Sequence, residues 1–202
     1  MQVQLLNAVE LRVLGCLIEK QRTTPEQYPL TLNALRLACN QSTNRDPVTT
    51  YDEETVRAAA QSLGTRGYAR LATGPGSRTP KYRQLFAEAL DLMPAEVSIL
   101  AVLMLRGPQT AAELKARTAR LHAMADVSPV LETLAEKELV HRVPRQPGTR
   151  EDRFAHLLGD APAEEPGDVQ VEAAASLERR LSELEARVAG LERMLAARAP
   201  LA

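Results

Sequence analysis

The stretch ELRVLGCL, residues 10–17, recurs in altered form as EVSILAVL, residues 96–103. Three further pairs of similar segments follow in the same order, namely 31–35 with 110–114, 63–71 with 134–142, and 75–78 with 147–150. Because the order is kept throughout, we interpret the chain as one supersecondary unit that occurs twice.

Each unit is predicted to begin with two helices. Asn7 precedes an apolar pattern of period 3.6, and Glu10 stands three residues later, at the spacing of a capping box. The second helix is expected to open at Thr31 in the first copy. Its counterpart in the second copy, Thr110 with Glu113, has the complete capping-box pattern.

A third helix and a β-hairpin complete the unit. In the first copy the helix is expected to open at Asp52 and to stop near Gly67, since glycine tolerates positive φ. Strands are expected over residues 68–72 and 81–85, on either side of a turn rich in Gly and Pro. In the second copy Glu138 occupies the place of Gly67, which predicts a slightly strained turn there.

Three helices followed by a hairpin form the winged-helix arrangement. We therefore predict an α+β, mainly α protein with two tandem winged-helix domains and a C-terminal coiled-coil helix. The predicted parts are domain 1 over residues 1–88, domain 2 over 89–158, an acidic linker over 159–172 and the coiled-coil helix over 173–198.

The tail has apolar residues at alternating spacings of three and four, as in a coiled coil. In a parallel pair Arg180 would meet Glu185 of the other chain and Arg187 would meet Glu192, whereas an antiparallel pair would bring like charges together. The pattern predicts a parallel homodimer, and the alternative is a helix that folds back on its own chain. The predicted dimerisation residues are Leu177, Leu181, Leu184, Val188, Leu191 and Leu195.

Composition restricts the class of protein. The formal net charge of −1 by itself indicates neither a nucleic-acid binder nor an acidic tail. We find no signal peptide and no long apolar run, which predicts a cytoplasmic protein with no membrane partner. Cys16 and Cys39 lie in apolar helical patterns, so we expect free, buried thiols.

Basic residues gather in the two hairpins, while acidic residues such as Glu53, Glu54 and Glu132 lie on the third helices. Acidic side chains repel phosphates, so these helices are unsuited to the usual major-groove docking. We therefore expect any DNA contact to be made by the wings. The alternative is that the arginines only keep the edge strands soluble. The predicted DNA-binding residues are Arg70, Arg78, Lys81, Arg83, Arg142, Arg145, Arg150 and Arg153.

The first copy has two polar insertions, residues 23–30 and 40–50, that the second copy lacks. The fold does not require them, which makes them candidates for function. Their Asn, Ser, Thr and Asp residues also close turns and cap helices, so we prefer structural bracing over binding. The residues predicted for a ligand or partner surface are Tyr28, Asn40, Gln41, Asn44, Arg45 and Asp46.

Two segments carry a resemblance to a known family. LIEKQRTTPEQYPLTLNALRLACNQSTNRDPV (17–48) and LRGPQTAAELKAR (105–117) resemble the motifs of the YceH-like family of uncharacterised bacterial proteins. The resemblance covers residues 5–158 and implies a cytoplasmic protein with tandem winged-helix domains, but it implies no reaction. Ser42 departs from the pattern, because lysine is frequent at this position in the family.

No motif for catalysis stands out. There is no P-loop, and GPGSR (74–78) is too short to cradle a phosphate. His141 and His156 are expected on paired strands, where a metal site would need further ligands, and Tyr28, Arg45 and Asp46 are candidates for lining a small-molecule pocket. We predict no catalytic residue, no metal and no cofactor.

We thus interpret the chain as a non-enzymatic protein that resembles a transcription regulator and contacts the phosphates of double-stranded DNA through its basic wings. The alternative is a dimeric protein–protein interaction module with no direct DNA contact, a role that acidic third helices and polar insertions would also suit.

Overall fold

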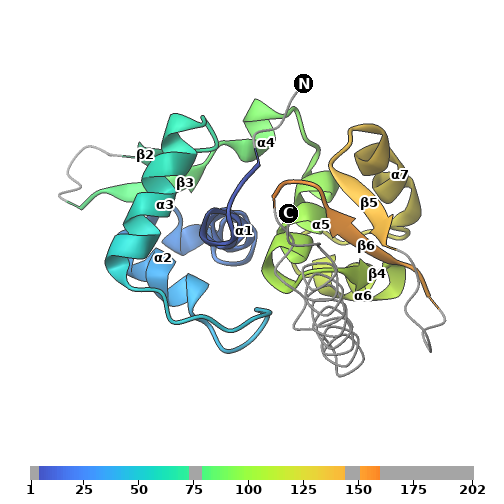
Figure 1. Cartoon of the computed structure of the whole chain (residues 1–202), viewed down its shortest axis with the longest axis horizontal. Helices are drawn as coiled ribbons and strands as arrows, with labels where there is room; N and C mark the ends of the chain where they lie inside the picture. Colours follow the sequence, from blue (N-terminus) through green and yellow to red (C-terminus); the bar gives the residue numbers. More distant parts are fainter. Residues whose placement is uncertain (1–4, 73–78, 144–150, 160–202) are drawn as a thin grey trace, which may run out of the picture. The chain divides into compact units, whose positions relative to one another are not determined.

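The computed structural model describes residues 5–72, 79–143 and 151–159, all of which belong to one compact unit (Figure 1). The elements of the first half are α1 (Ala8–Thr23), the 3₁₀ helix η1 (Pro25–Gln27), β1 (Leu30–Thr31), α2 (Leu32–Cys39), α3 (Glu53–Thr65), β2 (Ala69–Ala72), β3 (Lys81–Gln84) and α4 (Phe86–Ala89). Those of the second half are α5 (Pro94–Arg106), β4 (Gln109–Thr110), α6 (Ala111–Thr118), α7 (Ser128–Glu136), β5 (Val140–Val143) and β6 (Arg153–His156).

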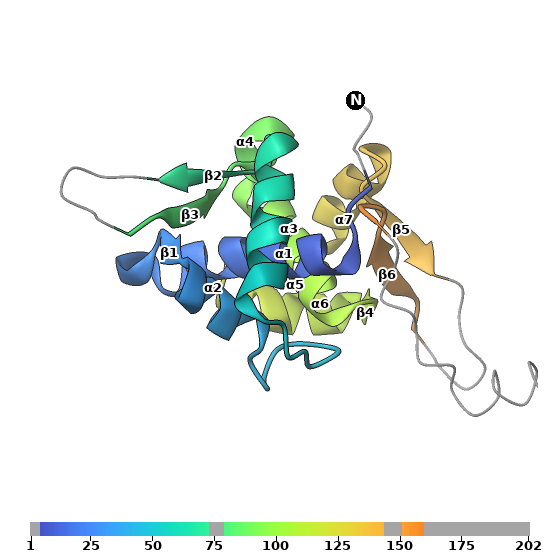
Figure 2. The ribbon, with the colours of Figure 1, turned by 60° about the vertical axis from the view of Figure 1, so that its left-hand side comes forward.

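The two halves follow the same chain path: helix, short strand, two helices and a hairpin. Each contains a three-stranded antiparallel sheet, in the order β1-β3-β2 in the first half and β4-β6-β5 in the second. In Figure 2 each hairpin extends away from the helices of its own half. The predicted α+β class is confirmed, and the sequence repeat corresponds to a repeated order of elements.

Local side-chain chemistry sets the helix starts. The Asn7 side chain accepts from the Glu10 N–H at 2.9 Å, and the Glu10 carboxylate accepts from the Asn7 N–H at 2.8 Å. Thr110 and Glu113 make the same reciprocal pair at the start of α6, at 3.2 and 2.9 Å. Both predicted capping boxes are therefore confirmed.

The third helices also begin and end as expected in the first half. The Asp52 carboxylate accepts from the Thr55 N–H at 2.8 Å and caps α3. Beyond the helix, Gly67 has a φ of +77°, and in the second half Glu138 adopts a φ of +57° at the matching place. A glutamate in this left-handed region is disfavoured, so the predicted strain after α7 is confirmed.

Four short elements were not predicted: η1, β1, β4 and α4. β1 consists of two residues, Leu30 and Thr31, which pair with Tyr82 and Lys81 of β3. Two residues are too few to show the alternation typical of a strand, so only the partner strand defines β1. The same holds for β4, which pairs with β6.

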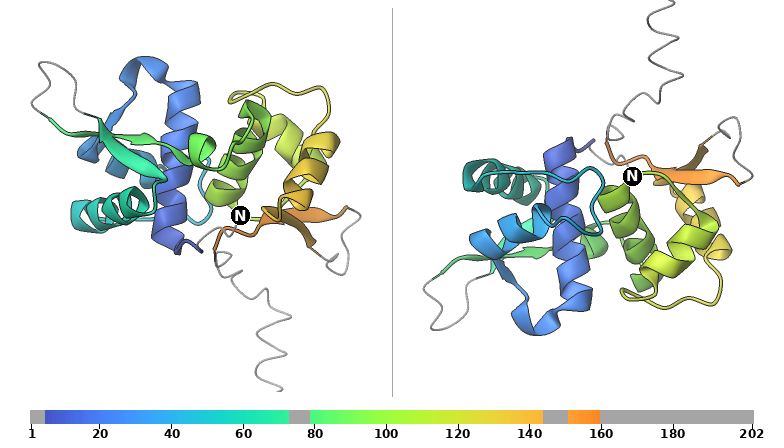
Figure 3. Two further views of the ribbon diagram at one scale, coloured as in Figure 1. Left: turned by 90° about the horizontal axis from the view of Figure 1, so that it is seen from above. Right: turned by 90° about the horizontal axis from the view of Figure 1, so that it is seen from below.

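The two halves share one hydrophobic core. Helices α1 and α5 lie side by side in both views of Figure 3, and the buried apolar side chains form a single cluster that includes residues of both halves. Gly15 marks the closest approach, since a Cβ there would lie 2.9 Å from Leu105 Cγ and 3.2 Å from Met104 Cβ. The predicted domain boundary between residues 88 and 89 falls within α4, before its last residue, and it stays a prediction.

Several predictions fall on the rest of the chain. The coiled-coil helix, its dimerisation residues and the acidic linker after Gly159 lie outside the described residues. Cys16 and Cys39 are both buried and free. Within residues 5–72, 79–143 and 151–159, none of the helices has both the length and the apolar character needed to cross a bilayer.

Candidate functional site

The first hairpin gathers its basic residues on one face. Arg70 lies directly opposite Arg83, and Ala72 lies opposite Lys81, so the three basic side chains share the face that points away from the core. On the other face Ala69, Tyr82 and Gln84 are buried, whereas Leu71 is exposed. Arg83 also pairs with Glu88 of α4 at 2.6 Å. No residue of β2 or β3 is acidic, so this face is positively charged.

The second hairpin distributes its basic residues differently. Arg142 lies opposite Phe154, whereas Arg153 lies opposite Val143, which places the two arginines on opposite faces. The Arg142 guanidinium lies 5.7 Å from the centre of the Phe154 ring and pairs with Asp152 at 3.1 Å. This hairpin therefore lacks the single basic face of the first, as far as its described strands go.

The tips of both hairpins lie outside the described residues. They hold three of the eight predicted DNA-binding residues: Arg78, Arg145 and Arg150. The structure therefore describes Arg70, Lys81 and Arg83 as one group and Arg142 and Arg153 as separate, exposed side chains.

The third helices present acidic side chains to solvent. In α3, Glu53 and Glu54 are exposed, and Arg57 pairs with Glu54 at 2.5 Å and with Glu53 at 4.0 Å. In α7, Glu132 and Glu136 are exposed. The arginine that could offset the charge at the start of α3 is thus already occupied by carboxylates, which disfavours docking of this helix against phosphates.

The second polar insertion is braced by its own hydrogen bonds. The Asn40 side chain accepts from the Tyr51 N–H at 2.8 Å and donates to the Tyr51 carbonyl at 2.7 Å. Arg12 of α1 donates to the carbonyls of Cys39, at 3.2 Å, and Pro47, at 2.6 Å. These contacts agree with the bracing interpretation.

Arg45 lies inside the protein, and its predicted place on a ligand surface is corrected here. Its guanidinium donates to both oxygens of Glu19, at 3.3 and 2.5 Å, and to the Ala38 carbonyl at 3.0 Å. The exposed fraction of the side chain is 0% for Arg45 and 2% for Glu19. Burial raises the pKa of Glu19, but the hydrogen bonds from Arg45 and the nearby positive charges of Arg45, Arg120 and Lys20 together outweigh it and hold this pKa below its usual value.

The same insertion joins the two halves. The Asp46 N–H donates to the Leu105 carbonyl at 2.8 Å, and Arg106 donates to the Asn44 side chain at 3.1 Å. Asn44 adopts a φ of 59°, which asparagine tolerates better than most residues. The second polar insertion, which the second copy lacks, therefore connects the two halves through hydrogen bonds. We call these contacts of Asn44 and Asp46 with α5 the clasp.

The first insertion makes different contacts. The Tyr28 hydroxyl accepts from the Gln84 N–H of β3 at 2.6 Å, and burial raises the pKa of Tyr28 to about 12. Among the described residues, no hydrogen bond or ion pair joins Tyr28 to Arg45 or Asp46. The hydrogen bonds and ion pairs of the described residues thus do not connect the three residues proposed for a small-molecule pocket.

The two histidines proposed as a metal pair are also apart. His141 lies opposite Ala155, and His156 lies opposite Val140, so the two imidazoles are on opposite faces of the hairpin. His141 is exposed and His156 is buried. The register therefore rules out the idea that they face each other.

Sequence reasoning missed Glu19, Arg106 and Arg120 at the junction. Arg120 also pairs with the Glu19 carboxylate, across the two halves. One signal was present: Glu19 follows Gly15 by four residues, which places it on the same face of α1 as the glycine that packs against α5.

Comparison with known proteins places these features in context. The family described as "Protein of unknown function, DUF480" matches residues 6–149. A UPF0502 protein of Pseudomonas fluorescens (strain Pf0-1) is 46% identical over 202 residues, covering 95% of this chain and 92% of that protein. A UPF0502 protein of Geobacter sulfurreducens is 54% identical over 163 residues, covering 78% of this chain and 74% of that protein.

A solved structure, ScpB from Mycobacterium tuberculosis, is similar over 76% of this chain and 93% of that chain, with 24% sequence identity and a TM-score of 0.28.

Proposed function

We propose a function for this chain, which belongs to the family described as "Protein of unknown function, DUF480". This is the YceH-like family that its motifs indicate. The chain is a tandem winged-helix protein of the cytoplasm that resembles a transcription regulator. It catalyses no reaction and binds double-stranded DNA by contacting phosphates through its wings, the first wing above all.

The cross-strand pair of Arg70 and Arg83 is the observation that carries the proposal. Like charges directly opposite each other destabilise an antiparallel pair. Lys81 adds a third positive charge on the same face. Phosphates of a DNA backbone would relieve this repulsion, and neutralising them releases condensed counterions, which favours binding. The ion pair of Arg83 with exposed Glu88 costs little to exchange.

Docking through the wing also agrees with the charge of the helices. A winged helix that reads the major groove inserts its third helix. Here Glu53 and Glu54 stand at the exposed start of α3 and would meet the phosphates first. The basic face of the wing is free of that repulsion, so it is the better phosphate contact.

The first prediction concerns salt dependence. If each chain neutralises three phosphates, the binding constant should fall with a log–log salt slope of about −2.7 per chain. Arg70→Ala or Lys81→Ala should each flatten the slope by about 0.9, because each removes one phosphate contact. Gel-shift titrations over a salt series, with an arbitrary duplex, measure both quantities.

The matched control is Arg57→Ala, which removes an exposed arginine from α3 and should leave the slope unchanged. A loss equal to that of Arg70→Ala would instead place α3 on the DNA. Binding that is absent, or insensitive to salt, would favour the protein–protein interaction module.

A parallel coiled coil through Leu177, Leu184 and the other dimerisation residues completes the proposal, because two chains would present two basic wings. Sedimentation equilibrium should give twice the chain mass for the full protein and the single-chain mass for a version ending at Gly159. Equal oligomeric states for the two versions would contradict the pairing.

A further inference from the structure

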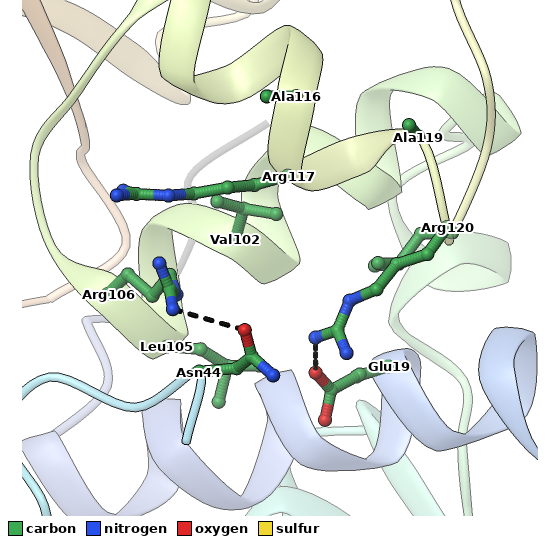
Figure 4. Close-up of a pocket in the computed structure, with 10 residues that line it drawn as sticks. Glu19, Asn44, Val102, Leu105, Arg106, Ala116, Arg117, Ala119 and Arg120 are labelled. Carbon is green, nitrogen blue, oxygen red and sulfur yellow. Dashed lines mark hydrogen bonds and ion pairs between the residues drawn. The ribbon is translucent and has the colours of Figure 1, made fainter.

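A cavity of about 280 Å³ lies at the junction of the two halves (Figure 4). Glu19 of α1 and Asn44 of the second insertion line it from the first half. Helix α5, helix α6 and the residues that follow α6 line it from the second half. The walls of this junction cavity are mainly apolar, and they include Val102, Leu105 and Leu121.

Three arginines line the junction cavity: Arg106, Arg117 and Arg120. Figure 4 shows Arg106 and Arg117 on one side of it and Arg120 on the other, above Glu19. They come from different places in the chain, at the end of α5, in α6 and just after α6. Burial and the charges of Arg117 and Arg120 lower the pKa of Arg106. The like charges are thus close enough to repel one another.

The nearby carboxylates do not fully neutralise the positive charge of these three arginines. Glu19 already receives two hydrogen bonds from buried Arg45, so its pair with Arg120 adds a second cation to one carboxylate. Arg117 pairs with Glu113 at 3.2 Å, one turn earlier on the surface of α6. Surface pairs of this kind are weak and can be exchanged at little cost. The hydrogen bond described for the Arg106 guanidinium goes to a neutral group, the Asn44 side chain, and the nearby charge of Asp46 only partly offsets those of Arg117 and Arg120.

We infer that the junction cavity binds a small anion, a phosphate or carboxylate group carried on a compact apolar body, held by Arg106, Arg117 and Arg120. Guanidinium groups match the planar fork of two anionic oxygens and bind such groups through charge-assisted hydrogen bonds. A largely apolar pocket with a few convergent polar groups is the usual form of a small-molecule site.

The position gives the ligand a defined effect. Its anionic group would contact arginines of the second half, while Glu19 and Asn44 border it from the first half. An anion bound there therefore relieves repulsion at the clasp between the halves. It binds the folded chain and not the unfolded one, so it raises the stability of the folded state.

Thermal unfolding of the full chain tests this site. The probes are inorganic phosphate and malonate, each compared with sodium chloride at the same ionic strength. We expect either or both to raise the melting temperature of the wild type beyond the chloride control, and the stronger probe identifies the preferred anionic group. Arg117→Ala and Arg106→Ala should each weaken the apparent affinity for that probe by about tenfold, since each removes a charge-assisted hydrogen bond.

Two matched variants separate this site from general charge effects. Arg57→Ala removes an arginine that also has an i,i+4 carboxylate partner, on α3 and outside the junction cavity, and it should respond to the anion like the wild type. Arg117→Lys keeps the positive charge but lacks the planar N–H donors of the guanidinium group, so the anion should raise its melting temperature by an intermediate amount. Equal loss of response in Arg57→Ala and Arg117→Ala, or a wild type that does not distinguish the anions from chloride, would overturn the inference.

Discussion

Replacing Arg45 with alanine is expected to lower the free energy of unfolding by about 3 kcal/mol, because removing one partner of a buried ion pair leaves the other charge only partly compensated. The Glu19 carboxylate would retain Arg120, but it would lose both hydrogen bonds from the buried guanidinium. The carbonyl of Ala38 would lose its bond from Arg45 as well. Urea denaturation of the full chain, followed by circular dichroism, measures the change.

Arg57→Ala is the matched control for this variant. Arg57 has two carboxylate partners, but its side chain is 40% exposed, so its removal should cost no more than about 1 kcal/mol. If Arg45→Ala proves as mild as Arg57→Ala, the buried pair does not stabilise the clasp and our account of the insertion is wrong.

Acid should weaken the protein through His156. Burial, followed by the charge of His141, lowers the pKa of His156 to about 4, against 6.5 for the free side chain. Between these values the unfolded chain binds a proton that the folded chain excludes. The contribution of this histidine is therefore complete above pH 6.5 and is lost as the pH falls toward 4. The loss amounts to about 3 kcal/mol between pH 7 and pH 4.

The measurement is the free energy of unfolding in urea over this pH range, for the wild type and for His156→Gln. Carboxylates such as Glu19 also titrate in acid, so the test is the difference between the two curves and not either slope alone. The wild type should lose about 3 kcal/mol more than the variant between pH 7 and pH 4. His122→Gln, at an exposed histidine, should follow the wild type. Parallel curves for the wild type and His156→Gln would contradict the assignment.

Local features of the chain were predicted well, because they depend on neighbouring residues. The capping boxes of Asn7 with Glu10 and of Thr110 with Glu113 depend on a spacing of three residues. The left-handed turn at Gly67 could likewise be placed from one residue type. The order of helices and hairpins followed from these signals together with the repeat.

The junction of the halves could not be predicted, because its partners are distant in the sequence. Glu19 and Arg45 are 26 residues apart, and Glu19 and Arg120 are 101 apart. Polar composition identified residues 40–50 as unusual, but composition does not tell a loop that meets a ligand from one that meets α5. The register of the second hairpin, which separates Arg142 from Arg153, is also set only by pairing.

The close contact of α1 with α5 at Gly15 bears on how the protein would meet a long duplex. In many proteins with tandem domains, a flexible linker lets each DNA-binding domain search for its site independently. Here the packing of α1 against α5 joins the two halves in one hydrophobic core, so the two hairpins extend from a shared core. A DNA duplex that contacts both hairpins would have to match the separation between them, either through its helical phase or by bending.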